Sequence, residues 1–187
     1  MNRVKDFIGI LFAIFLAFRT WELIRQLHGT PPDSFGTNEN LVVVLMLSLF
    51  VTGFFAFTGF ALPTHKLLPK GYYRVRKPII LRFWYRYLGG SAFRLFLKIF
   101  FWGPKNTKKR FFNGRRDDIQ RMARVTKQSE FSHLMAFIVL AILSIDLLVL
   151  GFEPIFWGTT IINVVGNLYP VLLQRLHRVR ISEIFNL

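Results

Sequence analysis

The chain has 187 residues, no cysteine and a formal net charge of +15, although 52% of its residues are hydrophobic. This length favours a single domain, and 22 phenylalanines together with long Leu, Ile and Val runs exclude a disordered chain. Without thiols, the chain forms neither a disulfide scaffold nor a cysteine-based zinc or redox site. Such hydrophobicity rarely accompanies so much positive charge in a soluble domain, so the position of the charge is informative.

The positive charge is concentrated in the middle of the chain. Residues 63–130 contain 18 of the 25 Lys and Arg residues and only three acidic residues, so they carry the whole net charge of +15. Nucleic-acid-binding proteins also concentrate positive charge, but they do not flank it with uncharged apolar runs of membrane-spanning length. We therefore expect residues 1–187 to form one all-α, polytopic integral membrane domain without a nucleic-acid partner.

Two hydrophobic segments precede the basic region. Residues 4–24 follow Arg3 and Lys5 and would extend about 30 Å as a helix, enough to cross the hydrocarbon core. A secretory signal peptide would share this basic start, but no small-x-small cleavage motif follows, which favours a retained helix. Residues 41–62 contain no charged side chain and form the clearest predicted span.

Two further spans are predicted after the basic region, at residues 133–152 and 154–173. The connection Gly151-Phe152-Glu153-Pro154 predicts a tight antiparallel hairpin, with Pro154 in the first turn of the second helix. Four spans place the basic region and both termini on one side of the membrane, and acidic or neutral loops on the other. The positive-inside rule then predicts a multi-pass protein of the cytoplasmic (inner) membrane with both termini in the cytoplasm.

Residues 79–102 are largely apolar and aromatic, although they lie within the basic region. Four basic residues recur in them at steps of four or eight: Arg82, Arg86, Arg94 and Lys98. Helices with this pattern usually lie in the membrane interface and bind anionic lipid headgroups. We expect such interfacial helices here, divided at Gly89-Gly90. A re-entrant or fifth spanning helix is the alternative, at a cost of a few kcal/mol for each buried cation.

Polar residues gather where the last two predicted helices meet the basic region. Glu130 and His133 are three residues apart, and hence on one face of the third helix. Because the hairpin is antiparallel, they lie at the depth of polar residues near the end of the fourth helix. These residues are Gln174, Arg175, Arg178 and Arg180, with Asn163 and Asn167 deeper in the membrane.

This arrangement predicts a general-base site in which Glu130 orients His133, and His133 accepts a proton from a hydroxyl group. A polar helix start at the headgroup level explains the Glu–His pair equally well. The arginines are alternatively membrane-edge anchors on lipid phosphates, and the intramembrane asparagines are alternatively helix–helix hydrogen-bonding groups.

Asp146 lies about 20 Å deeper in the third span than His133, too far to be its partner. We expect Asp146 to hydrogen-bond with Thr159, Thr160 or Asn163 across the hairpin, with a proton path as the lesser alternative. No His, Asp and Glu residues are grouped with the spacing of metal ligands, so no metal site is expected.

The residues of this site resemble a known pattern. Glu130-Phe131-Ser132-His133, preceded by arginines, resembles the Glu-Phe-Ser-His element of the glycosyl-diaponeurosporenoate acyltransferases. Asn167, Pro170 and Gln174-Arg175-x-x-Arg178-x-Arg180 resemble the C-terminal element of that family. The resemblance covers about residues 121–181 and implies a small polytopic membrane enzyme that acylates a sugar-linked carotenoid. Leu176 and His177, between the first two arginines, differ from the family's Tyr-Asn, which implies a divergent branch. The resemblance therefore does not extend to the carotenoid substrate.

We therefore predict a membrane acyltransferase that moves a fatty acyl group onto a hydroxyl of a lipid-embedded acceptor, a glycolipid or glycosylated isoprenoid-like lipid. Asn167 and Gln174 would position the acceptor or the developing oxyanion. Arg175, Arg178 and Arg180 would bind the phosphates of an acyl-CoA-like donor, the co-substrate, and no bound cofactor is expected. The alternative is a non-catalytic small subunit, or a lipid-binding component, of a larger membrane complex with protein partners.

Overall fold

The structure is a computed structural model that describes residues 3–87 and 116–185, together with Gly89, Gly90, Phe93, Leu95 and Ile99. Within these residues every regular element is helical. Four helices are long and apolar enough to cross a membrane. The prediction of an all-α membrane protein with four spans is therefore confirmed.

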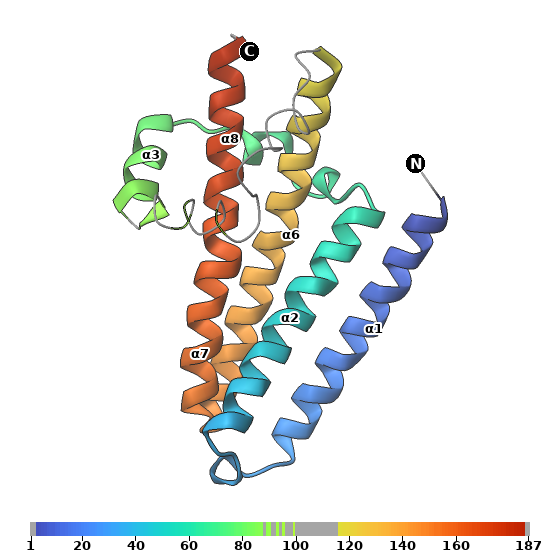
Figure 1. Ribbon diagram of the computed structural model, residues 1–187, viewed down its shortest axis with the longest axis vertical. Coiled ribbons are helices and arrows are strands. Elements are labelled where there is room, and N and C mark those ends of the chain that lie inside the picture. Colours follow the sequence, from blue (N-terminus) through green and yellow to red (C-terminus); the bar gives the residue numbers. More distant parts are fainter. Residues whose placement is uncertain are drawn as a thin grey trace.

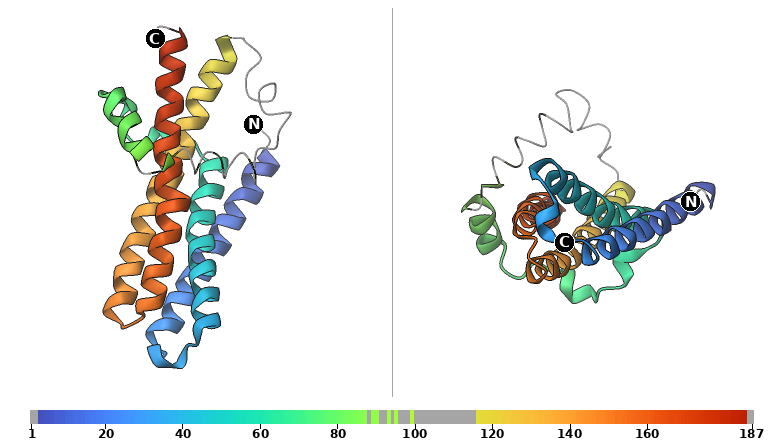
Figure 2. Two further views of the ribbon diagram at one scale, coloured as in Figure 1. Left: turned by 60° about the vertical axis from the view of Figure 1, so that its left-hand side comes forward. Right: turned by 90° about the horizontal axis from the view of Figure 1, so that it is seen from below.

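The four long helices form an elongated bundle (Figure 1). In chain order the spans are α1 (Arg3–His28), α2 (Thr37–Ala61), α6 (Arg116–Val149) and a nearly continuous helix made of α7 (Glu153–Asn163), the π-helical turn η5 (Val164–Leu168) and α8 (Tyr169–Phe185). α1 packs along α2, while α6 packs against α2, α7 and α8. Both chain termini lie at the end of the bundle where α2 ends and α6 begins (Figures 1 and 2). This end is called the basic end below.

At the basic end, α6 and α8 extend well beyond α2 (Figure 1). They therefore exceed the spans predicted at 133–152 and 154–173, because hydropathy marks only the apolar part of a helix. Residues 120–128 continue α6 with Gln, Arg, Met, Ala and Lys, which have good helix propensity. Glu130 and His133 consequently lie well inside a helix of 34 residues, and not at a helix start.

The core lies between α2, α6 and α7. It consists of ten buried hydrophobic residues, which include one from α1 and one from the α6–α7 turn: Leu27, Val43, Val44, Leu47, Val51, Ala136, Leu140, Leu147, Phe152 and Ile155. Large hydrophobic side chains on the outward faces of the same helices are exposed, as expected for helices that face lipid. α1 approaches α2 closely at glycines, since a Cβ added at Gly53 would lie 2.8 Å from the side chain of Leu16.

The predicted hairpin between the last two spans is confirmed. Gly151 has a φ of 91°, a left-handed conformation that glycine adopts without strain, and it reverses the chain between α6 and α7. Pro154 occupies the first turn of α7, where its missing N–H leaves no helical hydrogen bond unmade. The hairpin brings the polar residues of α6 and α8 to the same end of the bundle.

Three short 3₁₀ turns connect the long helices: η1 (Pro32–Ser34), η2 (Thr64–Lys66) and η3 (Lys70–Tyr73). They are followed by α3 (Pro78–Tyr87), which packs on the outside of α8. Arg82 of α3 forms an ion pair with Glu183 of α8. Several large apolar side chains of α3 are exposed, which is typical of an interfacial helix.

The predicted division at Gly89-Gly90 agrees with the end of α3, since Gly89 has a φ of 79°. Most of the interfacial pattern beyond it, including Arg94 and Lys98, and all of 100–115 lie outside the described residues.

The prediction that Asp146 bonds to Thr159, Thr160 or Asn163 is wrong. Asp146 Oδ2 lies 3.3 Å from His28 Nε2, at the end of α1 opposite the basic end. Buried Ser144 and Leu147 occupy the inward face of α6, and each residue turns the helix by roughly 100°. Asp146 therefore faces α1, and Asn163 donates to the backbone carbonyl of Phe137.

The contact between Asp146 and His28 is expected to contribute little to stability. Both side chains are more than 40% exposed, at 42% and 44%, and exposed pairs contribute about 0–1 kcal/mol. Replacing Asp146 by Asn should therefore change the free energy of unfolding in detergent by less than about 1 kcal/mol. A larger loss would show that the pair is buried in the folded protein.

Candidate functional site

The site begins where α6 passes the end of α2. Gln128 of α6 donates two hydrogen bonds to carbonyls at that end, one to Leu62 at 2.7 Å and one to Gly59. The last carbonyls of a helix have no partner within the helix, so this side chain both satisfies them and fixes α6 against α2. Residues just after Gln128 are thereby held at the depth where the α2 span ends.

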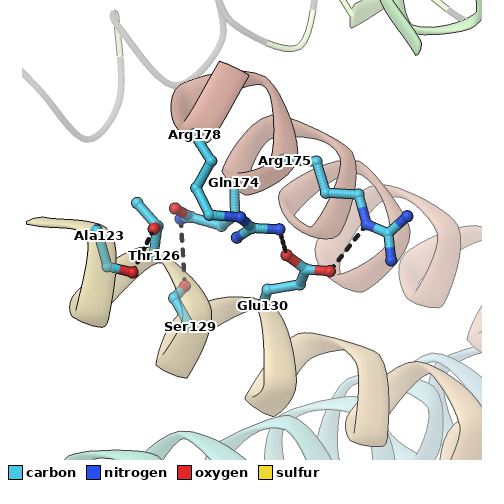
Figure 3. Close-up of polar contacts among 7 residues, drawn as sticks. All are labelled: Ala123, Thr126, Ser129, Glu130, Gln174, Arg175 and Arg178. Atoms are coloured by element: carbon cyan, nitrogen blue, oxygen red, sulfur yellow. Dashed lines mark hydrogen bonds and ion pairs between the residues drawn. The ribbon is translucent and has the colours of Figure 1, made fainter. Parts of the chain in front are cut away.

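Glu130 is completely buried and lies between two guanidinium groups of α8 (Figure 3). One carboxylate oxygen accepts a hydrogen bond of 2.8 Å from Arg175 Nε, and the other accepts one from Arg178 Nη2. This arrangement differs from the prediction that Glu130 orients His133. Glu130 and His133 do share a helix, but the carboxylate turns toward the two cations, which neutralise its charge away from water.

Two tyrosines of η3 complete this cluster, and the sequence analysis did not identify them. The guanidinium carbon of Arg175 lies 4.7 Å from the ring centre of Tyr72, and that of Arg178 lies 5.5 Å from the ring centre of Tyr73. Burial, followed by the nearby charge of Glu130, raises the pKa of Tyr72 and raises that of Tyr73 to about 12. Both hydroxyls therefore keep their protons at neutral pH.

His133 belongs to a second polar network, deeper in the bundle. Its Nδ1 lies 3.1 Å from Oδ1 of Asn167, which is buried. The amide nitrogen of Asn167 donates to Asn163 Oδ1 at 3.0 Å and to Thr52 Oγ1 at 3.1 Å. The network thus joins α6, α7, η5 and α2, and it holds the imidazole in one orientation.

The network also determines which nitrogen of His133 carries the proton. The Phe137 carbonyl only accepts, so the Asn163 amide nitrogen must donate to it, at 2.9 Å, and Asn163 Oδ1 must accept from Asn167. The remaining Asn167 oxygen then accepts from His133 Nδ1. Neutral His133 therefore has its proton on Nδ1 and a lone pair on Nε2.

A backbone carbonyl of the last span also faces the imidazole. The carbonyl of Gly166 lies close to the His133 ring. In a regular helix this carbonyl would accept from residue 170, but Pro170 has no N–H to donate. The proline therefore leaves the carbonyl available, and the chain widens into the π-helical turn at Val164–Leu168.

A pocket of about 180 Å³ lies between α2 and α6 beside His133. It is lined by Ala56, Gly59, Phe60, Val125, Gln128, Ser129, Ser132 and His133. Phe60 is 79% exposed and Val125 is 56% exposed, so the pocket opens through an apolar rim at the outer surface of the bundle. Ser129 accepts a hydrogen bond of 3.2 Å from Gln174 Nε2 (Figure 3), which leaves its own proton available to the pocket.

The predicted site residues therefore form two groups. Arg175 and Arg178 form an ionic cluster around the buried Glu130, and His133 and Asn167 belong to the network beside the pocket. Gln174 connects α8 to the pocket through Ser129, whereas Arg180 is exposed. Among the described residues, no three His, Asp and Glu side chains lie close enough together to hold a metal ion.

Residues 69–187 match the family described as glycosyl-4,4'-diaponeurosporenoate acyltransferase. The match begins just before η3 and includes both tyrosines, α6, α8 and the π-helical turn. It leaves out α1 and α2, which supplies Thr52 and one wall of the pocket. No curated protein and no solved structure matches the chain.

Proposed function

The chain belongs to the glycosyl-4,4'-diaponeurosporenoate acyltransferase family, and from this premise we propose that it acylates a hydroxyl group of a glycosylated, isoprenoid-like membrane lipid. The observation that carries the proposal is the position of His133. Its imidazole lines an apolar-rimmed pocket and is held by Asn167. A neutral histidine with a fixed orientation is suited to act as a general base.

In the proposed reaction, Nε2 of His133 takes the proton of the acceptor hydroxyl. The hydroxyl oxygen then forms a bond to the carbonyl carbon of an acyl thioester, and the carbon–sulfur bond breaks. The thiol leaves with the proton returned by the imidazolium, so no further reactant is needed. The hydroxyl of Ser129, fixed by Gln174, would stabilise the negative charge that develops on the carbonyl oxygen.

The surroundings of the pocket suit a substrate that is itself a lipid. The exposed rim residues Phe60 and Val125 allow an acyl or isoprenoid chain to enter from the bilayer. The polar side chains of Ser129, Ser132 and His133 also line the pocket. The basic end carries both termini and most of the described cations, so the positive-inside rule favours the cytoplasmic side of the inner membrane. The acyl donor would then arrive from the cytoplasm.

The rival role is that of a non-catalytic subunit of a larger membrane complex. That role would require only that the polar side chains join helices. The ionic cluster around Glu130 meets this description, but His133 does not, because its imidazole lines a pocket as well as bonding to Asn167. The pocket therefore favours the enzyme.

The proposal is tested by supplying membranes that contain the protein with a radiolabelled fatty acyl-CoA and glycosylated isoprenoid lipids. We expect a labelled lipid whose label is released by mild alkali, as an ester would be. Membranes without the protein serve as the control. Identical lipid profiles from the two preparations would contradict the proposed function.

Filling the pocket should block the reaction without unfolding the protein. Replacing Ala56 by Phe places a ring in the space beside His133, so we expect acyl transfer to fall about 10²-fold through misplaced substrate. The matched control is Leu49→Phe, which adds a ring on the exposed face of the same helix, where Leu49 is 67% exposed. Equal activity of the two variants would place the substrate elsewhere.

A further inference from the structure

Several polar groups around Tyr73 are buried without an acceptor. Tyr73 is 6% exposed, and its hydroxyl has no hydrogen-bond partner among the described residues. The side chain of Arg178 is 9% exposed, and its Nε and Nη1 likewise have none in this part of the chain. Because unsatisfied buried donors are costly, such a group of them indicates a ligand that supplies acceptors.

These donors converge from three elements of the fold. Arg178 of α8 lies over the ring of Tyr73, which belongs to η3. Lys127 of α6 lies near the same ring, with Nζ 5.7 Å from its centre. A phenol, a guanidinium and an ammonium group therefore meet around one buried aromatic ring, although they are far apart in the sequence.

The local charge is positive in spite of Glu130. Arg175 and Arg178 both pair with this one buried carboxylate, and Lys127 adds a third positive charge beside the ring of Tyr73. His65 is affected by the same positive charge. Burial, followed by the charges of Lys66, Arg124 and Lys127, lowers the pKa of its imidazole. An anion at Tyr73 would therefore be attracted by the net excess of positive charge.

We propose that Tyr73, Lys127 and Arg178 form a binding site for a phosphate group. Phosphate carries several acceptor oxygens and a negative charge, which match a hydroxyl donor, an ammonium group and the two unpaired nitrogens of a guanidinium group. The ion pair with Glu130 holds the third arm of Arg178, so that Nε and Nη1 are presented in a fixed direction. Arg180, which the sequence analysis assigned to this task, is exposed and is not part of the site.

The position of the site relates it to the reaction. Lys127 precedes His133 by six residues on α6, or roughly 9 Å along the helix axis toward the basic end. Gln174, which holds Ser129 at the pocket, is one helical turn from Arg178 on α8. We assign the site to a phosphate of the acyl donor, an assignment that rests on the proposed function, whereas the binding of phosphate itself does not.

The experiment measures equilibrium binding of coenzyme A to the full-length protein in a neutral detergent. Tyr73→Phe keeps the ring and removes only the hydroxyl, and Lys127→Gln removes the ammonium charge. Each variant should weaken binding roughly tenfold or more. The matched controls are Tyr87→Phe, at a tyrosine that is 75% exposed, and Lys70→Gln, at an exposed lysine of η3, and both should bind as the wild type does.

The same variants are then tested for binding of phosphatidylglycerol, supplied in nanodiscs against a phosphatidylcholine background. If only this lipid binds less well to Tyr73→Phe, the site takes a lipid phosphate, and the assignment to the donor is overturned. Unchanged binding of both coenzyme A and lipid would overturn the site itself. The acyl-transfer assay of the wild type separates the two proposals. Coenzyme A binding that depends on Tyr73, without acyl transfer in the wild type, would contradict the function and support the site.

Discussion

Replacing Glu130 by Gln is expected to lower the free energy of unfolding by about 3–5 kcal/mol. Glu130 is completely buried and is the shared partner of Arg175 and Arg178. Glutamine has nearly the same shape but no charge, so it leaves Arg178 with an uncompensated charge in a largely buried position. The loss is measured by thermal or denaturant unfolding in detergent micelles.

The matched control for this substitution is Glu183→Gln. Glu183 also pairs with an arginine, Arg82, but both side chains are about half exposed. We expect a loss of no more than about 1 kcal/mol, because water screens an exposed pair. Equal stability of the two variants would show that the ion pairs of Glu130 with Arg175 and Arg178 do not stabilise the fold. The explanation for why Glu130 turns toward these arginines, and not toward His133, would then fail.

Replacing His133 by Gln is expected to lower kcat for acyl transfer by roughly 10²–10⁴-fold, the usual contribution of a general base. Glutamine retains a hydrogen-bonding group for Asn167, so we expect the folded protein to persist with a similar melting temperature. The measurement is the initial rate of labelled ester formation at saturating donor and acceptor. Loss of kcat with unchanged donor binding would identify a residue that acts in the chemical step.

The control for His133 is His28→Gln, since His28 lies at the opposite end of the bundle beside Asp146. This variant should transfer acyl groups at the wild-type rate. Equal rates for the two variants would contradict a role for His133 as the base. A joint loss of rate and melting temperature in His133→Gln alone would assign His133 to packing.

The positions of the spans could be predicted because hydropathy depends on local sequence. Long apolar runs marked α2 and the inner part of α6, and Gly151 and Pro154 marked the turn between the last two spans. The start of α6 could not be predicted in this way, because its first turns are polar and resemble a solvated loop. Only the structure shows that these turns continue α6 beyond the end of α2 (Figure 1).

The partners within the site were harder to predict than its location. The spacing of Glu130 and His133 correctly places them on one helical face, but it does not show which groups of α8 face them. Long-range partners carry no signal at all in spacing, as for Thr52, which is separated from Asn167 by 115 positions. Tyr72 and Tyr73 appear in the sequence only as two aromatic residues in a basic loop, which does not indicate that they contact the arginines.

Pro170 is the exception, because its effect follows from the sequence. A proline within a predicted helix removes the donor for the carbonyl four residues earlier, which here belongs to Gly166. The structure shows that this carbonyl lies close to His133 of the neighbouring helix.

The central claim is that neutral His133 carries its proton on Nδ1, which leaves Nε2 unprotonated and able to act as the base. The most direct test is the ¹⁵N NMR spectrum of the protein labelled only at its four histidines, with His133→Gln used to assign the resonance. We predict a protonated Nδ1 and an unprotonated Nε2 for His133 at neutral pH. The opposite tautomer, with its proton on Nε2, would contradict both the hydrogen-bond network through Asn167 and the proposed role of His133 as the base.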